Sequence, residues 1–515
     1  MSDAGAEPAT SGPPPRSRQS RRRSGQPRPT RGRLAVVAVV ALVLVAAAVT
    51  DRTVGAPALP TPPPLADGVP VAPVGSFSSS AFCVGGGVGP DGVTATTIYL
   101  TNTGPRAVPG LMVAEVAPGT EGGQTGSGTP SPDTHLDLTV PAGATVAVDP
   151  ARGLPAGILA ATFAFAGGGI AVNQVVTGAD GWSTAPCASQ TSTSSSFAGG
   201  ATAAGDALTL ALLNPGSTQA VVNISFLTPA GVIAPSPYQG LAVPAGGIVS
   251  ENVADYVQRQ PEIATLVTAE SGTVVAGQLQ RWSTGGSGGI ALRLGAPAPS
   301  TVWRFAQTTA EAHGTVTFHL ANPGTTPVTA TLAFGLPAAT VVPLQVAVPA
   351  QSVVTFDASA AHRLPLGTPY ATTVTAPAPI VVARSVQAPP GGPSPAWGAS
   401  AGTASTATGW VVPAPGVAGA PGTAGAMVES LAVADPEAVP ARVTVTVAAT
   451  GAPVAAFTVA PGSLVVLGAR LVGGLRALEV RADGPVVVEE DAGPAGAPGV
   501  VSSTGMPLPG RLGSG

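Results

Sequence analysis

Glu489, Glu490 and Asp491 form the only acidic triplet of the chain, and carboxyl groups are the side chains that hydrolytic chemistry most often needs. Glycosidases use two carboxyl groups that face each other across a cleft, one of them with a raised pKa. Three adjacent residues at the end of a strand-like run instead indicate a solvated sheet edge, where charge discourages pairing with another strand. The triplet therefore predicts an edge and no catalytic site.

The histidines and one serine motif lead to the same expectation. His313 and His319 lie six residues apart, on or beside the strand-like run GTVTFHLA. No third Asp, Glu or Cys stands at a spacing that suits a metal ion, so surface or rim positions are expected. Ser287 lies in GGSGG, which fits Gly-x-Ser-x-Gly, but the helix that follows a nucleophile elbow is missing. We expect no catalytic residue, no cofactor and no metal.

The charge distribution argues against nucleic acid as a partner. Charged residues make up 9% of the 515 residues, and the formal net charge is −4. Residues 1–33 hold eight arginines against two acids, whereas from Asp51 onward 14 arginines stand against 24 acids. Neutralising phosphates requires clustered cations, which the acidic body lacks.

A membrane signal directly follows the basic segment. Residues 34–49, LAVVAVVALVLVAAAV, are sixteen apolar residues without a charge. As a helix they would span ~24 Å, against ~30 Å of hydrocarbon in a bilayer. Positive charge on the first flank predicts a cytoplasmic tail and an extracytoplasmic body. We favour a signal-anchor; the alternatives are cleavage at Ala46-x-Ala48, which would secrete the body, and a buried core helix.

Cys83 and Cys187 are the only cysteines, and they flank the first of the repeats described below. An extracytoplasmic compartment permits oxidation, so we predict a disulfide between them. It would close a loop of just over 100 residues. Chain entropy gives such a loop about 4–5 kcal/mol of stabilisation. The alternative is two unpaired thiols.

One turn recurs four times, at intervals of 112, 108 and 113 residues. Alternating runs such as LTLALL and VNISFLT precede and follow it. This pattern around Asn-Pro-Gly predicts a strand, a tight turn and a second strand, because Pro presets φ and Gly accepts positive φ. The repeated turn positions are Asn102, Asn214, Asn322 and Asp435, in LTNTGPRAV, LLNPGSTQAVV, LANPGTTPV and VADPEAVP.

The pattern predicts an all-β chain of tandem immunoglobulin-like antiparallel β-sandwiches after an N-terminal transmembrane helix or signal segment. Short strands with turns every 8–12 residues are typical of such sandwiches. We expect separate bodies in a rod. A four-bladed propeller would also use four repeats, but its blades take about 40–50 residues each. The third copy contains seven strand-like runs, at 302–307, 314–320, 327–334, 341–348, 352–357, 370–375 and 379–387.

The domain order follows from the composition and the repeats. A Pro-dense stretch after the apolar run predicts an extended linker. The expected divisions are a basic cytoplasmic tail at 1–33, a transmembrane segment at 34–50, a linker at 51–78, sandwiches at 79–188, 189–298 and 299–395, a linker at 396–408, a fourth sandwich at 409–500 and a flexible tail at 501–515.

Several of these features together resemble an uncharacterised secreted bacterial family, catalogued as domain of unknown function 5719. They are the N-terminal signal, the bracketing cysteines, the NPG-type turns and the Trp-bearing connectors STVWRFA and TGWVVPA. The likeness covers roughly residues 80–500. It brings no established activity or catalytic residues. It implies an exported, envelope-associated protein of a high-GC Gram-positive bacterium.

We therefore expect a non-enzymatic, membrane-anchored scaffold or interaction protein of the bacterial cell envelope, whose partners are the membrane through residues 34–50 and an unidentified envelope protein or glycan. The alternative is a carbohydrate-binding or polysaccharide-processing protein with a site between modules, lined by tryptophans that stack on sugars. Packing at module junctions is the role we expect for the five tryptophans, which are Trp182, Trp282, Trp303, Trp397 and Trp410.

Overall fold

The computed structural model describes most of the chain after the predicted linker. Leu65–Gly515 is one compact unit. The predicted tail, transmembrane segment and most of the linker lie outside the described residues. Within the described part of the chain, no helix is long and apolar enough to cross a membrane. The described residues are 70–89, 92–117, 133–284, 287–337, 341–361, 363–389, 396–413, 427–468, 470, 477–494 and 501–509.

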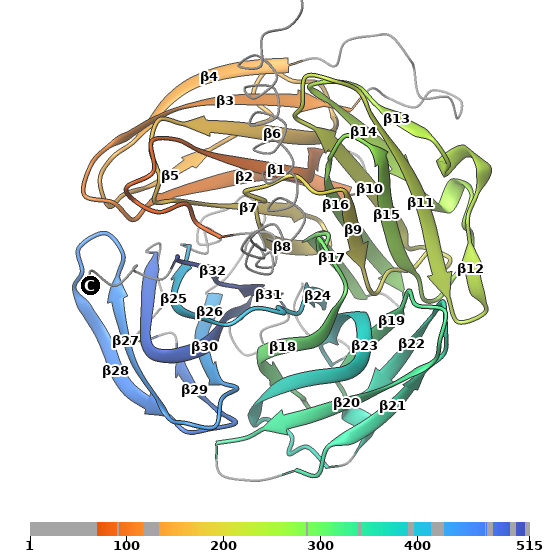
Figure 1. Ribbon diagram of the computed structural model, residues 1–515, viewed down its shortest axis with the longest axis vertical. Helices are drawn as coiled ribbons and strands as arrows, with labels where there is room; N and C mark the ends of the chain where they lie inside the picture. Colours follow the sequence, from red (N-terminus) through yellow and green to blue (C-terminus); the bar gives the residue numbers. More distant parts are fainter. Residues whose placement is uncertain are drawn as a thin grey trace, which may run out of the picture. The chain divides into compact units, whose positions relative to one another are not determined.

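Four successive repeats of similar strand order make up the described unit (Figure 1). Repeat 1 contains β1 Ser79–Val88, β2 Val93–Asn102, β3 Val108–Val116, β4 Asp133–Val140, β5 Thr145–Val148, β6 Gly157–Phe165, β7 Ile170–Gly178 and β8 Gly181–Pro186. Repeat 2 contains β9 Ser194–Phe197, β10 Ala207–Asn214, β11 Ala220–Thr228, β12 Gly231–Ile233, η2 Ser236–Tyr238, β13 Leu241–Val243, β14 Gly247–Asn252, η3 Val253–Asp255, β15 Ala264–Ser271, β16 Val275–Thr284 and β17 Ser287–Leu294.

Repeats 3 and 4 each contain one unusually long strand. Repeat 3 contains β18 Ser300–Thr309, β19 Thr315–Asn322, β20 Val328–Gly335, β21 Leu344–Val348, β22 Ser352–Asp357, η4 Ser359–Ala361, β23 Pro369–Gln387 and β24 Trp397–Ala401. Repeat 4 contains β25 Ala407–Val412, β26 Met427–Asp435, β27 Ala441–Val447, β28 Pro453–Val459, β29 Ser463–Gly468, β30 Leu478–Pro494, β31 Val501–Thr504 and β32 Met506–Pro507.

Each repeat contributes strands to two antiparallel layers. In repeat 1 the orders are β1-β6-β3-β4 and β5-β2-β7-β8, and repeat 2 follows with β9-β15-β11-β12 and β14-β10-β16-β17. In repeats 3 and 4 the sixth and seventh strands are continuous, so that β23 and β30 each pair in both layers. The prediction of an all-β fold with antiparallel sheets is confirmed.

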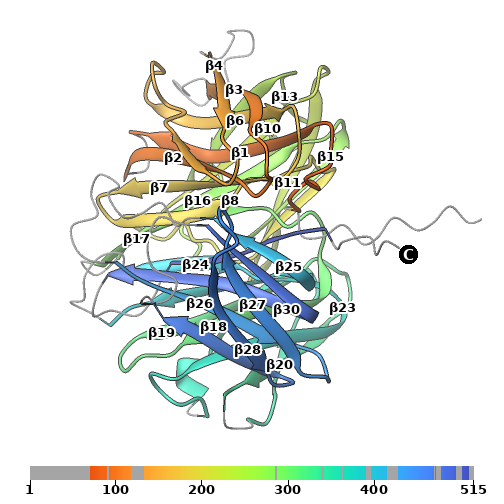
Figure 2. The ribbon, with the colours of Figure 1, turned by 90° about the vertical axis from the view of Figure 1, so that its left-hand side faces the viewer.

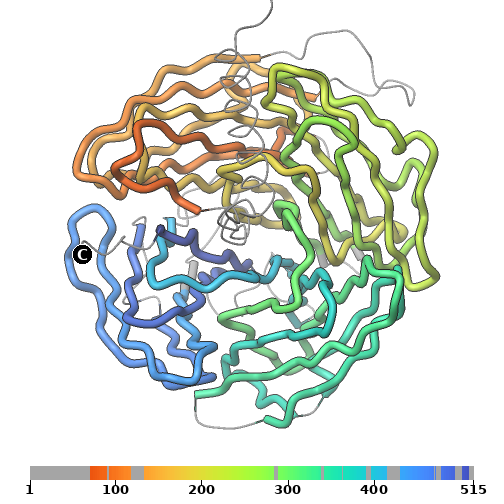
Figure 3. The backbone as a smooth tube through the Cα atoms, in the orientation of Figure 1, coloured from red at the N-terminus to blue at the C-terminus, as the bar shows by residue number. Residues whose placement is uncertain are grey.

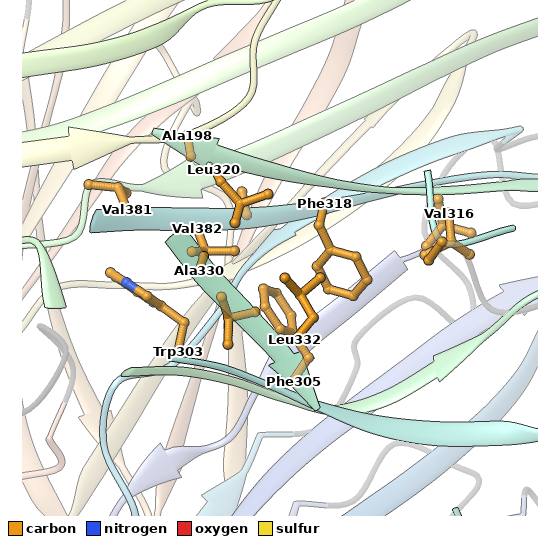
Figure 4. Packing of buried hydrophobic residues seen from close by; sticks show 14 of the residues in the cluster. Ala198, Trp303, Phe305, Val316, Phe318, Leu320, Ala330, Leu332, Val381 and Val382 are labelled. Carbon is orange, nitrogen blue, oxygen red and sulfur yellow. The ribbon is translucent and has the colours of Figure 1, made fainter. Parts of the chain in front are cut away.

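Period-two alternation explains why the strands bury one face. In β20, Val328, Ala330 and Leu332 are buried, whereas the threonines between them are partly or fully exposed. Successive strand residues point to opposite faces, so the apolar set faces the opposite layer. In Figure 4 the side chains of Ala330 and Leu332 meet those of β18 and β19, where the rings of Phe305 and Phe318 pack edge to face at 5.3 Å.

The repeats form a closed ring, and the expected rod is wrong (Figures 1 and 3). Buried apolar clusters join repeat 1 to 2, 2 to 3 and 3 to 4. Repeat 4 also returns to repeat 1, where Val71, Ala171, Val411, Met506 and Leu508 form a fourth contact cluster. Figure 2 shows repeat 4 below repeat 1 on the side that faces the viewer. Four two-layer repeats therefore close as propeller blades do, with twice the strands that a blade has.

Both ends of the described chain lie at the closing contact. The backbone N–H of Val71 donates to the Pro507 carbonyl at 3.0 Å, and that of Leu508 donates to the Gly409 carbonyl at 2.9 Å. We call this contact between repeats 1 and 4 the seam.

Repeats 2 and 3 share a sheet through one parallel pair, Gly289 opposite Trp397. A Cβ on Gly289 would lie 2.4 Å from Trp397 Cβ, so only glycine permits this approach.

Candidate functional site

A cavity of about 120 Å³ lies where the innermost strands of the four repeats meet. These strands are β8, β17, β24 and β31; β8 ends its sheet, β31 pairs with β30, and β17 and β24 meet where repeats 2 and 3 share a sheet. The cavity wall is formed mainly by residues 184–186, 292–297, 399–403 and 502–505, together with Trp303 and Trp410. We call this space the central cavity.

Strand register places equivalent positions of the four repeats around the central cavity. One position recurs in all four repeats on the strand next to the innermost one; its residues are Gln174, Gln278, Arg384 and Glu490. The residues that pair with it on the innermost strands are Ala185, Arg293, Ser400 and Ser503. These four partners all line the cavity. Three are small, and the fourth is the only charged residue among the described residues of the wall.

The wall of the central cavity is mostly apolar. Alanine, valine, leucine, proline and tryptophan side chains supply its apolar part, and hydroxyl groups such as those of Ser195, Ser503 and Thr504 interrupt it. The indole N–H of Trp303 donates to the Ile380 carbonyl at 2.8 Å, and that of Trp410 to Val486 at 3.1 Å. Both indoles are therefore fixed by the backbone of their own repeat. No Asp, Glu, His or Cys occurs among the described residues that line the cavity, so it offers binding contacts without an acid–base pair.

Arg293 is buried in the wall, with 5% of its surface exposed. Its Nη1 donates to the Ala198 carbonyl at 2.6 Å, and its Nη2 donates to Gly199 and, at 2.5 Å, to Gln278 Oε1. No described carboxylate forms an ion pair with it. Burial lowers the pKa of the guanidinium to about 10, and the charge of Glu262 opposes this shift.

A buried ionic cluster lies beside the central cavity at the contact between repeats 3 and 4. Arg384 Nη2 donates to Glu489 Oε1 at 2.5 Å and to Ser400 Oγ at 3.0 Å. The other carboxylate oxygen of Glu489 accepts the Gln307 N–H at 3.1 Å. The expectation that the triplet forms a solvated edge is wrong, because Glu489 and Asp491 are 2% and 5% exposed. The fourth-repeat strand β31 pairs with this part of β30 and covers it.

Asp491 adds a second carboxyl group to a cluster that has one cation. Burial and the neighbouring Glu489 raise its pKa to about 7, while Arg384 and a hydrogen bond to Ser502 oppose the shift. Its Oδ1 has no hydrogen-bond partner among the described atoms. The carboxyl group therefore holds a proton in the folded state at pH values where an unfolded Asp has lost it.

Asp491→Asn is expected to flatten the pH dependence of stability. Because the folded pKa lies above the unfolded value of about 3.9, the stabilisation is present at low pH and is lost as pH rises to about 7. Denaturant unfolding at pH 5 and pH 8 should give a drop in the free energy of unfolding that is about 2 kcal/mol smaller in the variant. An unchanged drop would mean that Asp491 ionises normally.

His319 lies partly buried between repeats 2 and 3 rather than at the expected surface or rim. Its side chain is 12% exposed, its Nδ1 lies 2.9 Å from both oxygens of Glu262, and its Nε2 lies 2.8 Å from Ser385 Oγ. His313 stands six residues away in a turn with φ of 66°, and His135 is exposed beside Asp133. His362 lies outside the described residues. No cluster of three metal-binding side chains occurs among the described residues.

The remaining motifs have structural positions. The disulfide between Cys83 and Cys187 is present, and it ties β1 to the segment after β8. Ser287 begins β17, which is a strand and not a strand-to-helix turn. Trp282 and Trp397 stack at 5.6 Å between repeats 2 and 3.

The repeated turn residues all lie in the interior, where their side chains bind backbone groups. Asn322 donates from Nδ2 to the Thr326 carbonyl at 2.8 Å and to Pro349 at 3.1 Å, and its Oδ1 accepts the Gly324 N–H at 2.9 Å. Asn102 and Asn214 make equivalent bonds. Asp435 has no amide N–H and instead accepts two backbone N–H groups, from Glu437 and Ala441. The glycines of these turns do not use positive φ, so the amide side chain fixes the turn.

Asn322→Ala is expected to lower the free energy of unfolding by about 2–3 kcal/mol, because buried carbonyl and N–H groups lose their partners. Denaturant titration of the variant measures this. Thr325→Ala changes an exposed residue of the same turn and should stay within about 0.5 kcal/mol of the parent. Equal effects of the two substitutions would contradict a structural role for the amide.

The model of one protein family matches residues 160–460, which is more than half of the chain. It is described as a family of unknown function, DUF5719. The chain belongs to this family. The resemblance predicted from the turns and connectors is thus confirmed, and the DUF5719 match includes repeats 2 and 3 in full and three of the four wall segments of the central cavity.

Comparisons beyond DUF5719 give little more. No curated protein matches the sequence. A crystal structure of Thermotoga maritima 1070 is 14% identical, and the match covers 20% of this chain and 93% of that one with a TM-score of 0.19. The tetra-tandem repeat in the extending region of a large adhesion protein is 13% identical, with coverages of 83% and 99% and a TM-score of 0.11. Neither likeness carries an argument about fold or function.

Proposed function

We propose that the protein is a non-enzymatic scaffold or interaction protein of the bacterial cell envelope. In this proposal, residues 34–50 anchor it in the membrane, and four immunoglobulin-like β-sandwich repeats form its extracytoplasmic body. The observation that carries the proposal is the composition of the central cavity. Among the described residues of its wall there is no carboxylate, imidazole or thiol, which are the groups that hydrolysis of a polysaccharide would need.

The rigidity of the ring supports a scaffold role. Every repeat contacts two neighbours through buried apolar side chains. The contact between repeats 3 and 4 also contains the buried ion pair of Arg384 and Glu489, and the contact between repeats 2 and 3 contains His319 bonded to Glu262. A body closed in this way holds the exposed side chains of all four repeats at fixed spacing. Fixed spacing favours affinity, because little conformational entropy is lost on binding.

The alternative is a protein that binds or processes wall carbohydrate at a site between repeats. The position of the central cavity and its hydroxyl groups favour binding of a polar ligand. Trp303 and Trp410 are 1% and 0% exposed, however, so their faces are not free to stack on a sugar ring. We therefore place carbohydrate recognition second.

The proposal is tested in intact cells of a bacterial host. The full chain should sediment with the membrane fraction. Protease added outside intact cells should digest its body. A photo-crosslinking amino acid at Val342 or Val439, which are 71% and 72% exposed, should then capture one envelope protein or glycan reproducibly. The same positions in a chain without residues 1–50 provide the control and should capture nothing from the envelope.

Two results would overturn the proposal. One is a body that external protease never reaches although the chain is folded and abundant. The other is release of reducing ends from purified wall polysaccharide by the full chain, with loss of that activity in Glu489→Gln. Binding of the polysaccharide without cleavage would instead identify glycan as the partner.

A further inference from the structure

The central cavity has two properties that rarely occur together. Its volume of about 120 Å³ is close to that of an engineered apolar cavity, about 150 Å³, that binds benzene. One aromatic ring or one branched alkyl group is therefore the largest apolar group that it can enclose. The second property is a buried cation in the wall, Arg293, where the three equivalent positions of the other repeats carry Ala or Ser.

The charge of Arg293 is not balanced by an ion pair. Three carbonyl oxygens accept from its Nη atoms, and its buried Nε has no hydrogen-bond partner among the described atoms. The nearest charge that acts on it, Glu262, already has both oxygens at 2.9 Å from His319. A guanidinium in an apolar wall without a counter-charge costs free energy, which an anion in the cavity would offset.

We propose that the central cavity binds a small organic anion, in which one carboxylate is joined to a single apolar group no larger than a benzene ring. The apolar group occupies the space between Leu292, Ala399 and Trp303, and the carboxylate lies on the Arg293 side. Planar carboxylates match the guanidinium, and charge-assisted hydrogen bonds are the stronger kind. Burial lowers the pKa of Arg293 to about 10 although the charge of Glu262 opposes the shift, which agrees with a cation that lacks a directly paired carboxylate.

The test uses 4-fluorobenzoate and its neutral analogue 4-fluorobenzamide with the purified full chain. Fluorine NMR of each probe measures binding, and a sample of the same buffer and detergent without protein gives the reference. We expect a dissociation constant of ~1 mM for the acid, from the free energy per atom typical of small ligands. The amide should bind at least ~10-fold more weakly, since it lacks the charge. Equal affinity for the two probes, or no binding of either, would overturn the proposal.

Two variants locate the site. Arg293→Gln should weaken 4-fluorobenzoate at least ~10-fold without changing the amide. If that variant does not fold, Ala399→Leu tests the location of the site. The larger side chain fills the cavity and should abolish binding of 4-fluorobenzoate. Ala230→Leu adds the same volume at an exposed turn and should bind as the parent does. Undiminished binding by Ala399→Leu would place the anion elsewhere and overturn the proposal.

The same chemistry occurs in free organic acids and in the C-terminus of a peptide. A tripeptide that ends in phenylalanine, with a free or an amidated C-terminus, separates these sources. Binding of the free-acid peptide, lost on amidation, would support the proposal and assign peptide C-termini. Binding of 4-fluorobenzoate alone would support it and assign free acids.

Discussion

Arg384→Met is expected to lower the free energy of unfolding by about 3–5 kcal/mol, because it leaves the Glu489 carboxylate buried without its counter-charge. Arg384 also donates to the Gln307 carbonyl, Thr308 Oγ1 and Ser400 Oγ, so the same change removes a partner from three groups of repeat 3. Its guanidinium lies 5.3 Å from the centre of the Phe305 ring. Denaturant titration followed by tryptophan fluorescence measures the loss.

Two further variants test whether the loss of stability comes from breaking the buried ion pair or from removing any arginine. Arg384→Met combined with Glu489→Met removes both charges and should recover most of the loss, since apolar residues often replace a buried pair at little cost. Arg481→Met breaks a pair whose arginine is 40% exposed and should change stability by less than about 1 kcal/mol. A change of that small size in Arg384→Met would show that the pair does not hold the two repeats together.

Cys83→Ala together with Cys187→Ala is expected to lower the free energy of unfolding by about 4 kcal/mol, because the bond closes a loop with a sequence separation of 104. The crosslink limits the freedom of the unfolded chain across the whole of repeat 1. In the folded state the bond stands beside a bridge in which Phe82 and Ala188 exchange two backbone hydrogen bonds. Reductant should destabilise the parent by the same amount and leave the double variant unchanged. An unchanged free energy of unfolding of the parent in reductant would contradict this expectation.

The layers within each repeat could be predicted from the sequence, and the ring could not. Alternation of apolar and polar residues is a local signal, and in the third repeat all seven predicted runs overlap strands that the structure contains. The last two runs are one strand, β23, which bends from one layer to the other at Ala376 to Pro379. The last strand of the repeat, β24, was predicted to be part of a linker at 396–408, because its sequence WGASA contains only small residues after the tryptophan.

Ring closure depends on contacts that have no periodic signature. At the contact between repeats 1 and 2, a Cβ on Gly277 would lie 2.4 Å from the Val84 carbonyl oxygen. At the contact between repeats 1 and 4, a Cβ on Gly143 would lie 2.5 Å from the Ala449 carbonyl oxygen. The chain has 68 glycines, and nothing in its composition distinguishes the two that allow the backbones of neighbouring repeats to approach this closely.

The central cavity was missed for a related reason. Arg293 in its wall and Arg384 beside it each stand alone in an apolar run, GIALRL and IVVARSVQ, where a single cation is typical of the exposed face of a strand. The available signal was the length of apolar sequence on both sides, which is typical of a strand buried on both faces. The acidic triplet was misread because β31, which covers it, has only four residues.

The hydrogen bond from Val71 to Pro507 means that the body begins and ends at one place. Joining these positions by a short linker should give a circular permutant that folds, with new ends at the exposed turn between β11 and β12. It also means that a pull between the two ends of the native body acts first on the seam of repeats 1 and 4. We expect the other three contacts between repeats to take most of the load only after that contact has separated.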